Sequence, residues 1–297
     1  MKNTYLFLFL CISFFEIQAQ QKYIDSLYEV LPVKTEIYAE KNGENLIIDL
    51  YLPQNISKDR PLIIFMHGGG FSGGSPKNEQ EINFAHIAAA KGYVVGLISY
   101  RLTRKGQLFG CNYPAEGKIK TFKMAAEDFM DSVDFMLDHA EEYGIDPEKI
   151  IVGGSSAGAE AVLNAVYNPQ LMFSLEREAV DFKAVISLAG AIVDVRYLTQ
   201  KLNVPGIFFH GTADNLVPYA TAPHHYCEPA QVGYLMLDGS KTITEKLAEL
   251  DTSFLFYSYK DAGHEISGMP FKEMPEIFSF LKKVVFDKEM VQKKVMK

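Results

Sequence analysis

The chain has 297 residues, of which 48% are hydrophobic and 22% are charged. This composition supplies enough apolar material for a buried core and differs from that of a disordered chain. The formal net charge of −8 argues against nucleic acids and anionic membrane surfaces as partners. Because α/β folds of about 200 to 250 residues commonly form one unit, we expect residues 20–297 to form a single domain.

Residues 1–19 differ from the rest of the chain. Lys2 supplies a positive charge, residues 5–15 form an apolar run, and Ala19 offers a small residue at a cleavage point. This pattern predicts a secretory signal peptide over residues 1–19, and hence a secreted or periplasmic protein. The apolar run is shorter than the roughly 20 residues that a membrane-spanning helix needs, so we expect no stable membrane insertion. A retained N-terminal anchor is the alternative.

Short apolar or β-branched runs alternate with longer helical patterns along the chain. Strands are predicted at Asn45–Leu52, Pro61–Met66, Tyr93–Tyr100, Lys149–Gly153, Phe182–Leu188, Pro205–His210 and Ser253–Tyr259. Helices are predicted at Glu81–Lys91, Phe122–Tyr143, Ala157–Tyr167, Thr242–Leu250 and Phe271–Phe286. Such alternation is typical of right-handed βαβ units. We therefore expect an α/β fold with a mostly parallel central sheet and helices on both faces.

The sequence GSSAG at residues 154–158 matches the G-x-S-x-G motif of a nucleophilic serine. It lies between a predicted strand and a predicted helix, where the motif forms a strained turn that requires small residues two positions from the serine. The N-terminus of the following helix directs backbone N–H groups at the point where negative charge develops. The motif therefore predicts Ser156 as a nucleophile. A tight strand-to-helix turn without catalytic chemistry is the alternative.

A second glycine-rich segment, HGGGF at residues 67–71, follows the predicted strand that ends at Met66. Three successive glycines leave the backbone free of side chains, so that N–H groups can converge on an oxyanion. A generic turn or a phosphate-binding loop is the alternative. The chain has no G-K-[ST] after these glycines, which weakens the phosphate interpretation.

An acid and a base follow two later strands. Asp214 follows the strand that ends at His210, and His264 follows the strand that ends at Tyr259. The chain order Ser, Asp, His is that of a triad in which the histidine activates the serine and the buried carboxylate orients the histidine. Asp194 is the alternative acid, because it also follows a predicted strand.

The remaining histidines receive structural interpretations. We expect His67 and His210 to brace loops, and the adjacent His224 and His225 to lie on the surface. A position in the pocket wall is the alternative for His224 and His225. No cluster of Asp, Glu or Cys with ligand spacing accompanies them. We therefore expect neither a catalytic metal nor a cofactor.

Five motifs together resemble a known family. The segments HGGGF at 67–71, SYRL at 99–102, GSSAG at 154–158, HGTADNLVP at 210–218 and DAGHE at 261–265 resemble the carboxylesterase and hormone-sensitive-lipase-like branch of the α/β-hydrolases. That branch includes secreted bacterial esterases that act on carbohydrate esters, and the resemblance covers roughly residues 45–285. It implies that residues 20–297 are one catalytic domain of a serine esterase.

The resemblance also assigns site residues. It implies that Ser156, Asp214 and His264 are the catalytic triad. It also implies that the backbone N–H groups of Gly69, Gly70 and Ala157 form the oxyanion hole. The chain departs from the hormone-sensitive-lipase pattern at Ser155, where that pattern has Asp, and at Ala159, where it has Gly.

The expected substrate is a small-molecule or carbohydrate ester with a short acyl or aryl group, such as acetyl or feruloyl. The reason is that no long insertion of the kind that builds a large lipase lid lies between Tyr167 and Lys183. An amidase or peptidase with the same triad is one alternative, because acyl transfer from amides uses identical machinery. A hydrolase-fold protein that only binds a partner is the other.

The cysteines permit one further expectation. Cys11 falls in the predicted signal peptide, which leaves Cys111 and Cys227 in a chain bound for an oxidising compartment. Both lie in long connections, Arg101–Thr121 and Gly211–Ser240, that leave strands at the edge where the triad assembles. We therefore expect a disulfide that joins these loops over the pocket. Two unpaired, buried cysteines are the alternative.

Overall fold

The structure is a computed structural model that describes residues 21–55, 57–173 and 180–297. The signal peptide predicted for residues 1–19 lies outside the described residues and stays a prediction. Within the described ranges, none of the helices has the length and apolar character that crossing a membrane requires.

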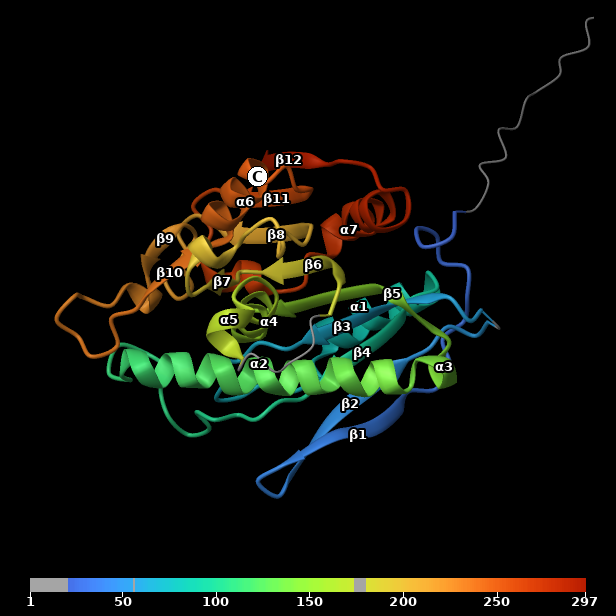
Figure 1. The fold of residues 1–297 in the computed structure, drawn as a ribbon, viewed down its shortest axis with the longest axis horizontal. Helices are drawn as coiled ribbons and strands as arrows, with labels where there is room; N and C mark the ends of the chain where they lie inside the picture. Colours follow the sequence, from blue (N-terminus) through green and yellow to red (C-terminus); the bar gives the residue numbers. More distant parts are fainter. Residues whose placement is uncertain (1–20, 56, 174–179) are drawn as a thin grey trace, which may run out of the picture.

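A sheet of nine strands runs through the described part of the chain, in the order β1-β2-β4-β3-β5-β6-β8-β11-β12. Its strands are β1 (Lys34–Lys41), β2 (Glu44–Tyr51), β3 (Arg60–Met66), β4 (Val94–Ile98), β5 (Ile145–Ser155), β6 (Phe182–Leu188), β8 (Gly206–Gly211), β11 (Phe254–Tyr259) and β12 (Gln292–Met296). Figure 1 shows this order from β12 at the top to β1 at the bottom. Neighbours from β4 to β12 pair in parallel, whereas β2 pairs antiparallel with β1 and β4.

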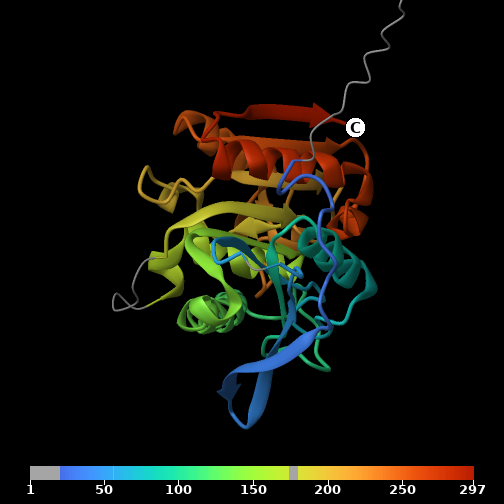
Figure 2. The same ribbon diagram turned by 90° about the vertical axis from the view of Figure 1, so that its right-hand side faces the viewer.

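Helices cover both faces of this sheet (Figure 2). They are α1 (Glu79–Ala90), α2 (Ala115–Asp138), α3 (Ala140–Tyr143), α4 (Ala157–Tyr167), α5 (Pro169–Met172), α6 (Ser240–Glu249) and α7 (Met274–Leu281). Successive side chains of a strand point to opposite faces, and β3 shows the result. Ile64 joins a core with α2, α4 and α6, while Phe65 joins the core of α1 and α7. The predicted α/β fold with a mostly parallel sheet is confirmed.

A second, smaller sheet lies in a region that the sequence predicts to be mostly loop. Within the described residues it consists of β7 (Ala191–Ile192), β9 (Thr221–Pro223) and β10 (Met236–Gly239), in the order β7-β10-β9. Two of its strands fall inside the connection Gly211–Ser240. Strands this short carry no recognisable alternation of apolar and polar residues, which is why the sequence did not predict them.

Two predicted helices differ from the structure by more than two residues at an end. The helix predicted at Phe122–Tyr143 begins earlier, at Ala115, and is interrupted at His139, whose φ of −104° and ψ of 16° leave the helical range. The residues added at its start include the exposed Glu116 and Lys120, so the apolar periodicity appears only later. The helix predicted at Phe271–Phe286 consists of the 3₁₀ turn η4 (Phe271–Glu273), α7, and the π-helical turn η5 (Lys282–Phe286).

Candidate active site

Ser156 occupies the turn between β5 and α4. Its φ of 50° and ψ of −120° are strained for a residue with a side chain. A Cβ on Gly154 would lie 2.5 Å from the carbonyl carbon of Gly158, and a Cβ on Gly158 would lie 2.2 Å from Met66 O. The turn thus has the strained backbone that the sequence predicts, and only glycine fits two positions before and two positions after the serine.

The structure brings the three predicted triad residues together. Ser156 Oγ lies 2.7 Å from His264 Nε2, and His264 Nδ1 lies 2.7 Å from Asp214 Oδ2. An imidazole that carries its proton on Nδ1 donates to the carboxylate and leaves Nε2 free to accept the proton of the serine hydroxyl. The geometry is therefore that of a nucleophile, a base and an orienting acid.

Two turns at the ends of neighbouring parallel strands hold the acid and the base together. The turn after β8 carries Asp214, and the turn after β11 leads to His264. Ala213 N donates to Ala262 O at 2.9 Å. A Cβ on Gly211 would lie 2.3 Å from Ala262 O, so glycine at that position lets the two turns pack closely.

Asp214 is a buried carboxylate, 1% exposed, with partners on both oxygens. Oδ1 accepts the N–H groups of Leu216 and Val217, while Oδ2 lies 2.7 Å from His264 Nδ1 and 3.3 Å from His210 Nε2. Burial alone would raise its pKa, but the hydrogen bonds and charges of the two histidines outweigh burial and hold the pKa of Asp214 well below its usual range. The lowered pKa favours the ionised form of Asp214 at neutral pH.

The glycine loop after β3 lies opposite Ser156. Gly69 and Gly70 have φ values of +119° and +60°, which favour glycine. Together with Ala157 at the start of α4, they line the cavity beside Ser156. No described residue accepts a hydrogen bond from the backbone N–H groups of these three residues. The predicted oxyanion-hole residues therefore lie beside the nucleophile with their donors unoccupied.

Ser156 opens into a cavity of about 500 Å³, a volume typical of small-molecule sites. Its lining comes from the glycine loop, the turn at Ser156, helix α1 and the segments after β8 and β11. Residues that line it include His67, Gly68, Ser155, Glu81, Phe109, Glu160, Leu216, Val217, His224, His225, His264 and Met269.

The structure corrects one expectation about the other histidines. His224 is buried, 1% exposed, and His225 is half-buried, and both line the cavity. The prediction of a surface position is therefore wrong for the buried His224, and the alternative, that the two histidines line the pocket, agrees with the structure. His224 is buried because its ring packs against Phe109 and Phe122, and contacts between residues so distant in sequence leave no local pattern.

The other candidates take structural roles. His67 contacts Gly68 O and stacks on Tyr100, and His210 contacts Ser240 Oγ. Asp194 pairs with Arg196 at the start of a 3₁₀ turn. The structure thus brings Asp214 to His264, and Asp194 binds an arginine instead.

Three ionisable residues near the cavity were not predicted. Glu81 on α1 and Glu160 on α4 line it, and Lys118 on α2 lies buried behind it. Burial raises the pKa of Glu81 to about 8 and raises the pKa of Glu160 well above its usual range. The sequence carries one signal: Glu160 stands in a helix of otherwise mostly small and apolar residues, the only acid between Ala157 and Tyr167.

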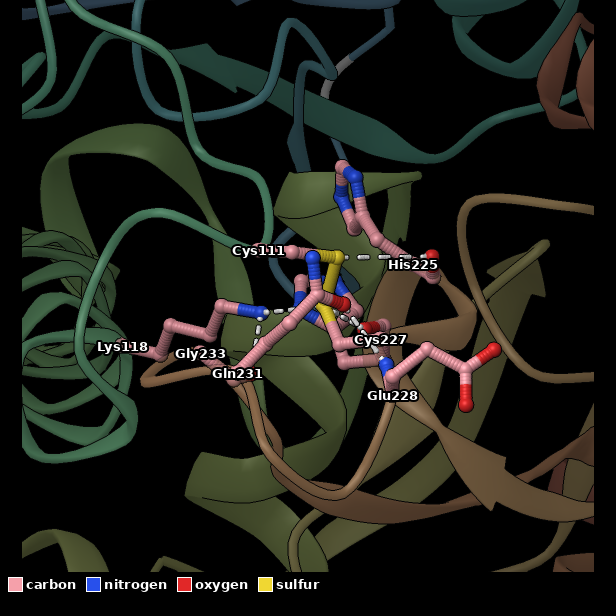
Figure 3. Close-up of a disulfide and its surroundings, with 8 residues drawn as sticks. Cys111, Lys118, His225, Cys227, Glu228, Gln231 and Gly233 are labelled. Atoms are coloured by element: carbon pink, nitrogen blue, oxygen red, sulfur yellow. Dashed lines mark hydrogen bonds between the residues drawn. A yellow bond between two sulfur atoms is a disulfide. The ribbon is translucent and has the colours of Figure 1, made fainter.

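Cys111 and Cys227 meet beside the cavity. Their Sγ atoms lie 2.13 Å apart, at disulfide distance, and join the connection before α2 to the connection after β8 (Figure 3). Close to them, Lys118 Nζ donates to Gly233 O at 2.8 Å, and Gly233 N donates to Cys111 O at 3.0 Å. We call these contacts the loop clip.

No group of three or more His, Cys, Asp or Glu side chains in the described ranges is arranged to hold a metal ion. The side chains that converge at Ser156 are those of acid and base chemistry.

The fold has relatives of known structure. The chain superposes on esterase 2 of Thermogutta terrifontis with a TM-score of 0.61 and 20% sequence identity, over 86% of this chain and 92% of that one. The superposition and the mostly parallel central sheet show that the protein has the α/β-hydrolase fold.

Sequence comparison defines the family. The BD-FAE family model matches residues 48–202, just over half of the chain, and the chain belongs to that family. It is also 29% identical to gut esterase 1 of Caenorhabditis briggsae over 157 residues, which are 52% of this chain and 26% of that protein. Arylacetamide deacetylase of Oryctolagus cuniculus is 28% identical over 178 residues, which are 56% of this chain and 41% of that protein. The chain thus spans less than half the length of these curated relatives.

Proposed function

We propose that the protein is a serine carboxylic ester hydrolase with Ser156 as nucleophile, His264 as base and Asp214 as orienting acid. The observation that carries this proposal is the unbroken series of contacts from Ser156 Oγ through the imidazole to Asp214, each 2.7 Å long. The names of the similar proteins, an esterase and a deacetylase, support the same activity.

The geometry supports a two-step acyl transfer. Ser156 Oγ attacks the ester carbonyl carbon while His264 Nε2 takes the hydroxyl proton. The carbonyl oxygen becomes an oxyanion, which the N–H groups of Gly69, Gly70 and Ala157 stabilise. The C–O bond to the alcohol then breaks, and the imidazolium gives its proton to the departing alkoxide. Water attacks the resulting acyl-enzyme by the same steps, which releases the carboxylic acid and restores Ser156.

Electrostatics favour this series of reaction steps. His264 gains a positive charge when it takes the serine proton, and the ionised Asp214 beside it stabilises that charge. The strained turn fixes Ser156 Oγ against the imidazole, and the unoccupied N–H donors need no rearrangement to receive the oxyanion. The site is therefore arranged for the transition state before a substrate arrives.

The proposed substrates are short acyl or aryl esters, such as acetyl or feruloyl groups on carbohydrate. A cavity of about 500 Å³ suits a group of that size. The ring of Phe109 and the side chains of Leu216 and Val217 form an apolar part of the cavity wall.

We also propose that the enzyme acts after export, as a secreted or periplasmic protein. The support is the signal-peptide pattern of residues 1–19 and the close approach of Cys111 and Cys227, since disulfides persist in oxidising compartments. Expression in a bacterial host followed by fractionation tests this proposal. The exported protein should begin at Gln20 by mass spectrometry, and an intact N-terminus on cytoplasmic protein contradicts it.

The activity is tested with a panel of p-nitrophenyl esters of increasing acyl length, together with methyl ferulate, acetylated xylan and an anilide. We expect turnover of short or aryl esters by the wild type and none above background by Ser156→Ala. Ser26→Ala is the matched control, because Ser26 is exposed and does not line the cavity. Turnover of the anilide alone indicates an amidase, and no turnover of any compound by folded wild type contradicts the proposal.

A further inference from the structure

Two buried polar side chains, Glu160 and His224, line the same cavity as Ser156. Glu160 lies one helical turn beyond the nucleophile on α4, where its backbone N–H donates to Ser156 O at 2.9 Å. His224 lies on the short 3₁₀ turn η2 (His224–Tyr226). The two residues are 2% and 1% exposed. No step of the proposed reaction uses either of them.

One polar atom of each side chain lacks a hydrogen-bond partner. Glu160 Oε1 and His224 Nδ1 are buried and have no partner among the described residues. Glu160 Oε1 and His224 Nε2 lie 3.3 Å apart, but the two atoms are not aligned as a hydrogen bond. Buried polar atoms are nearly always paired, and an unpaired one in a cavity needs an explanation. A ligand group that enters the cavity and completes the pairing is such an explanation.

The environment also favours the uncharged forms of both side chains. Burial raises the pKa of Glu160, the negative charge of Asp214 adds to this effect, and Lys118 opposes it. Burial lowers the pKa of His224, and the neighbouring His225 and Lys118 lower it further. A protonated carboxyl and a neutral imidazole each offer one donor and one acceptor. Such a pair is complementary to a hydroxyl group, which donates and accepts at once, and less so to a charged group.

We propose that Glu160 and His224 form a specificity-determining subsite that hydrogen-bonds a hydroxyl group of the ester substrate. This inference rests on the proposed esterase function and names a chemical feature of its substrate. The hydroxyl belongs to the acyl group or to the alcohol group, because both ends of an ester bound at Ser156 extend into the same cavity.

The loop clip fixes His224 for this role. The bridge between Cys111 and Cys227, only three residues beyond His224, anchors its segment to the connection before α2 (Figure 3). Lys118 Nζ also donates a hydrogen bond to Gly233 O, which lies in the same connection as His224. A Cβ on Gly233 would lie 2.6 Å from Cys111 O, so the close approach requires glycine. A subsite held in this way needs little rearrangement when it binds.

The experiment compares pairs of esters that differ only in a terminal hydroxyl or methyl group. The acyl arm uses ethyl esters of ω-hydroxy acids and of the fatty acids of equal length. The alcohol arm uses acetates of diols and of the simple alcohols of equal length. Spacers of two, four and six carbons vary the distance between the ester and the hydroxyl. The readout is the ratio of kcat/KM for the hydroxyl ester to kcat/KM for its methyl partner, which cancels any loss common to both.

Four variants test the subsite. Glu160→Leu removes the polar group, and Glu160→Gln keeps an uncharged donor and acceptor. His224→Phe removes both ring nitrogens and keeps the packing of an aromatic ring against Phe109 and Phe122. The control, Glu245→Leu, makes the same change at an exposed position of α6 outside the cavity.

We expect the wild-type ratio to exceed about 10 at the best spacer in one arm, which identifies the end that carries the hydroxyl. Glu160→Leu and His224→Phe should lower it about tenfold, Glu160→Gln less than threefold, and Glu245→Leu not at all. The subsite is overturned if folded, active Glu160→Leu or folded, active His224→Phe keeps the wild-type ratio. It is also overturned if the wild-type ratio is one or less in both arms. Those outcomes leave the esterase intact, whereas a wild type that cleaves no ester overturns the proposed function as well.

Discussion

Asp214 Oδ2 lies 2.7 Å from His264 Nδ1, while Oδ1 of the same carboxylate is held by backbone N–H groups. The acid therefore cannot rotate without losing either its backbone donors or its histidine. This fixed orientation determines how the protein responds to loss of the charge.

The first prediction concerns Asp214→Asn. The asparagine oxygen must take the place of Oδ1, because only an acceptor can pair with Leu216 N and Val217 N. The amide NH₂ group of the asparagine then donates a hydrogen bond to His264 Nδ1, which forces the proton of the imidazole onto Nε2. His264 can no longer accept the proton of Ser156, so kcat on any cleaved ester should fall by about 10⁴.

Asp194→Asn is the matched control, because Asp194 pairs with the exposed Arg196. Its kcat should stay within about threefold of the wild type, as exposed ion pairs contribute little. If Asp194→Asn is the inactive variant and Asp214→Asn keeps its rate, the acid assignment is wrong.

A second prediction uses the glycine loop. A Cβ on Gly69 would lie 2.2 Å from Gly73 O, and its φ of +119° disfavours any other residue. Gly69→Ala should therefore displace the N–H donors and lower kcat by about 10² to 10³, the loss expected for one oxyanion-hole donor. Steady-state kinetics should show the loss in kcat and little change in KM.

Gly73→Ala controls for alanine in the same loop, since nothing lies within 4 Å of a Cβ at that position. Its kcat should resemble that of the wild type. Equal rates for Gly69→Ala and Gly73→Ala would show that the loop contributes no donor to the reaction.

A third prediction concerns the pH dependence of stability. Burial raises the pKa of Glu81 from 4.5 to about 8, so between these values the folded chain holds a proton that the unfolded chain has lost. The free energy of unfolding must therefore fall as pH rises from about 4.5 to about 8, by at most about 5 kcal/mol from this group. Glu81→Gln, which cannot ionise, should be more stable than the wild type at pH 8 and gain little near pH 5.

Thermal unfolding of both proteins from pH 5 to pH 8.5 measures this difference. Glu79→Gln is the control, because Glu79 lies exposed on the same helix. The difference in Tm between Glu81→Gln and the wild type should widen by several degrees with pH, and that for Glu79→Gln should not. A constant difference across the range would mean that Glu81 ionises freely in the folded protein.

The motifs could be predicted because the chemistry restricts the residues. A strained turn at Ser156 admits only glycine at 154 and 158, and parallel strands bring Asp214 and His264 to the same edge of the sheet. Those demands leave a signature in the sequence itself. The same holds for the buried strands, since β6 has the predicted limits, Phe182–Leu188.

The burial of individual side chains in the cavity wall could not be predicted, because it depends on contacts between segments distant in sequence. The burial of His224 follows from the packing of its segment on Lys118 and Cys111, more than 100 residues earlier in the chain. The edge strand β12 was missed for another reason. Its residues are mostly exposed lysines and polar groups, and its pairing with β11 uses the backbone, which gives no apolar pattern.

The last prediction concerns the cysteines. The structure places their Sγ atoms at bonding distance across a sequence separation of 116 residues, and we predict that Cys111 and Cys227 are bridged in the exported protein. Thiol titration of the denatured protein before and after reduction should differ by two thiols per chain, whether or not Cys11 is present. No difference would refute the bridge.

Removal of the bridge should affect binding more than chemistry. A bridge over a loop of this length contributes about 4 to 5 kcal/mol in the chain-entropy model, so the double variant Cys111→Ser, Cys227→Ser should unfold at a Tm several degrees lower. Ser156, Asp214 and His264 are positioned by β5, β8 and β11 and their turns, so kcat should change less than threefold. The wall that carries His224 loses an anchor while Lys118 still holds Gly233, so KM should rise severalfold. A fall in kcat with constant KM would show instead that the loop clip supports the triad.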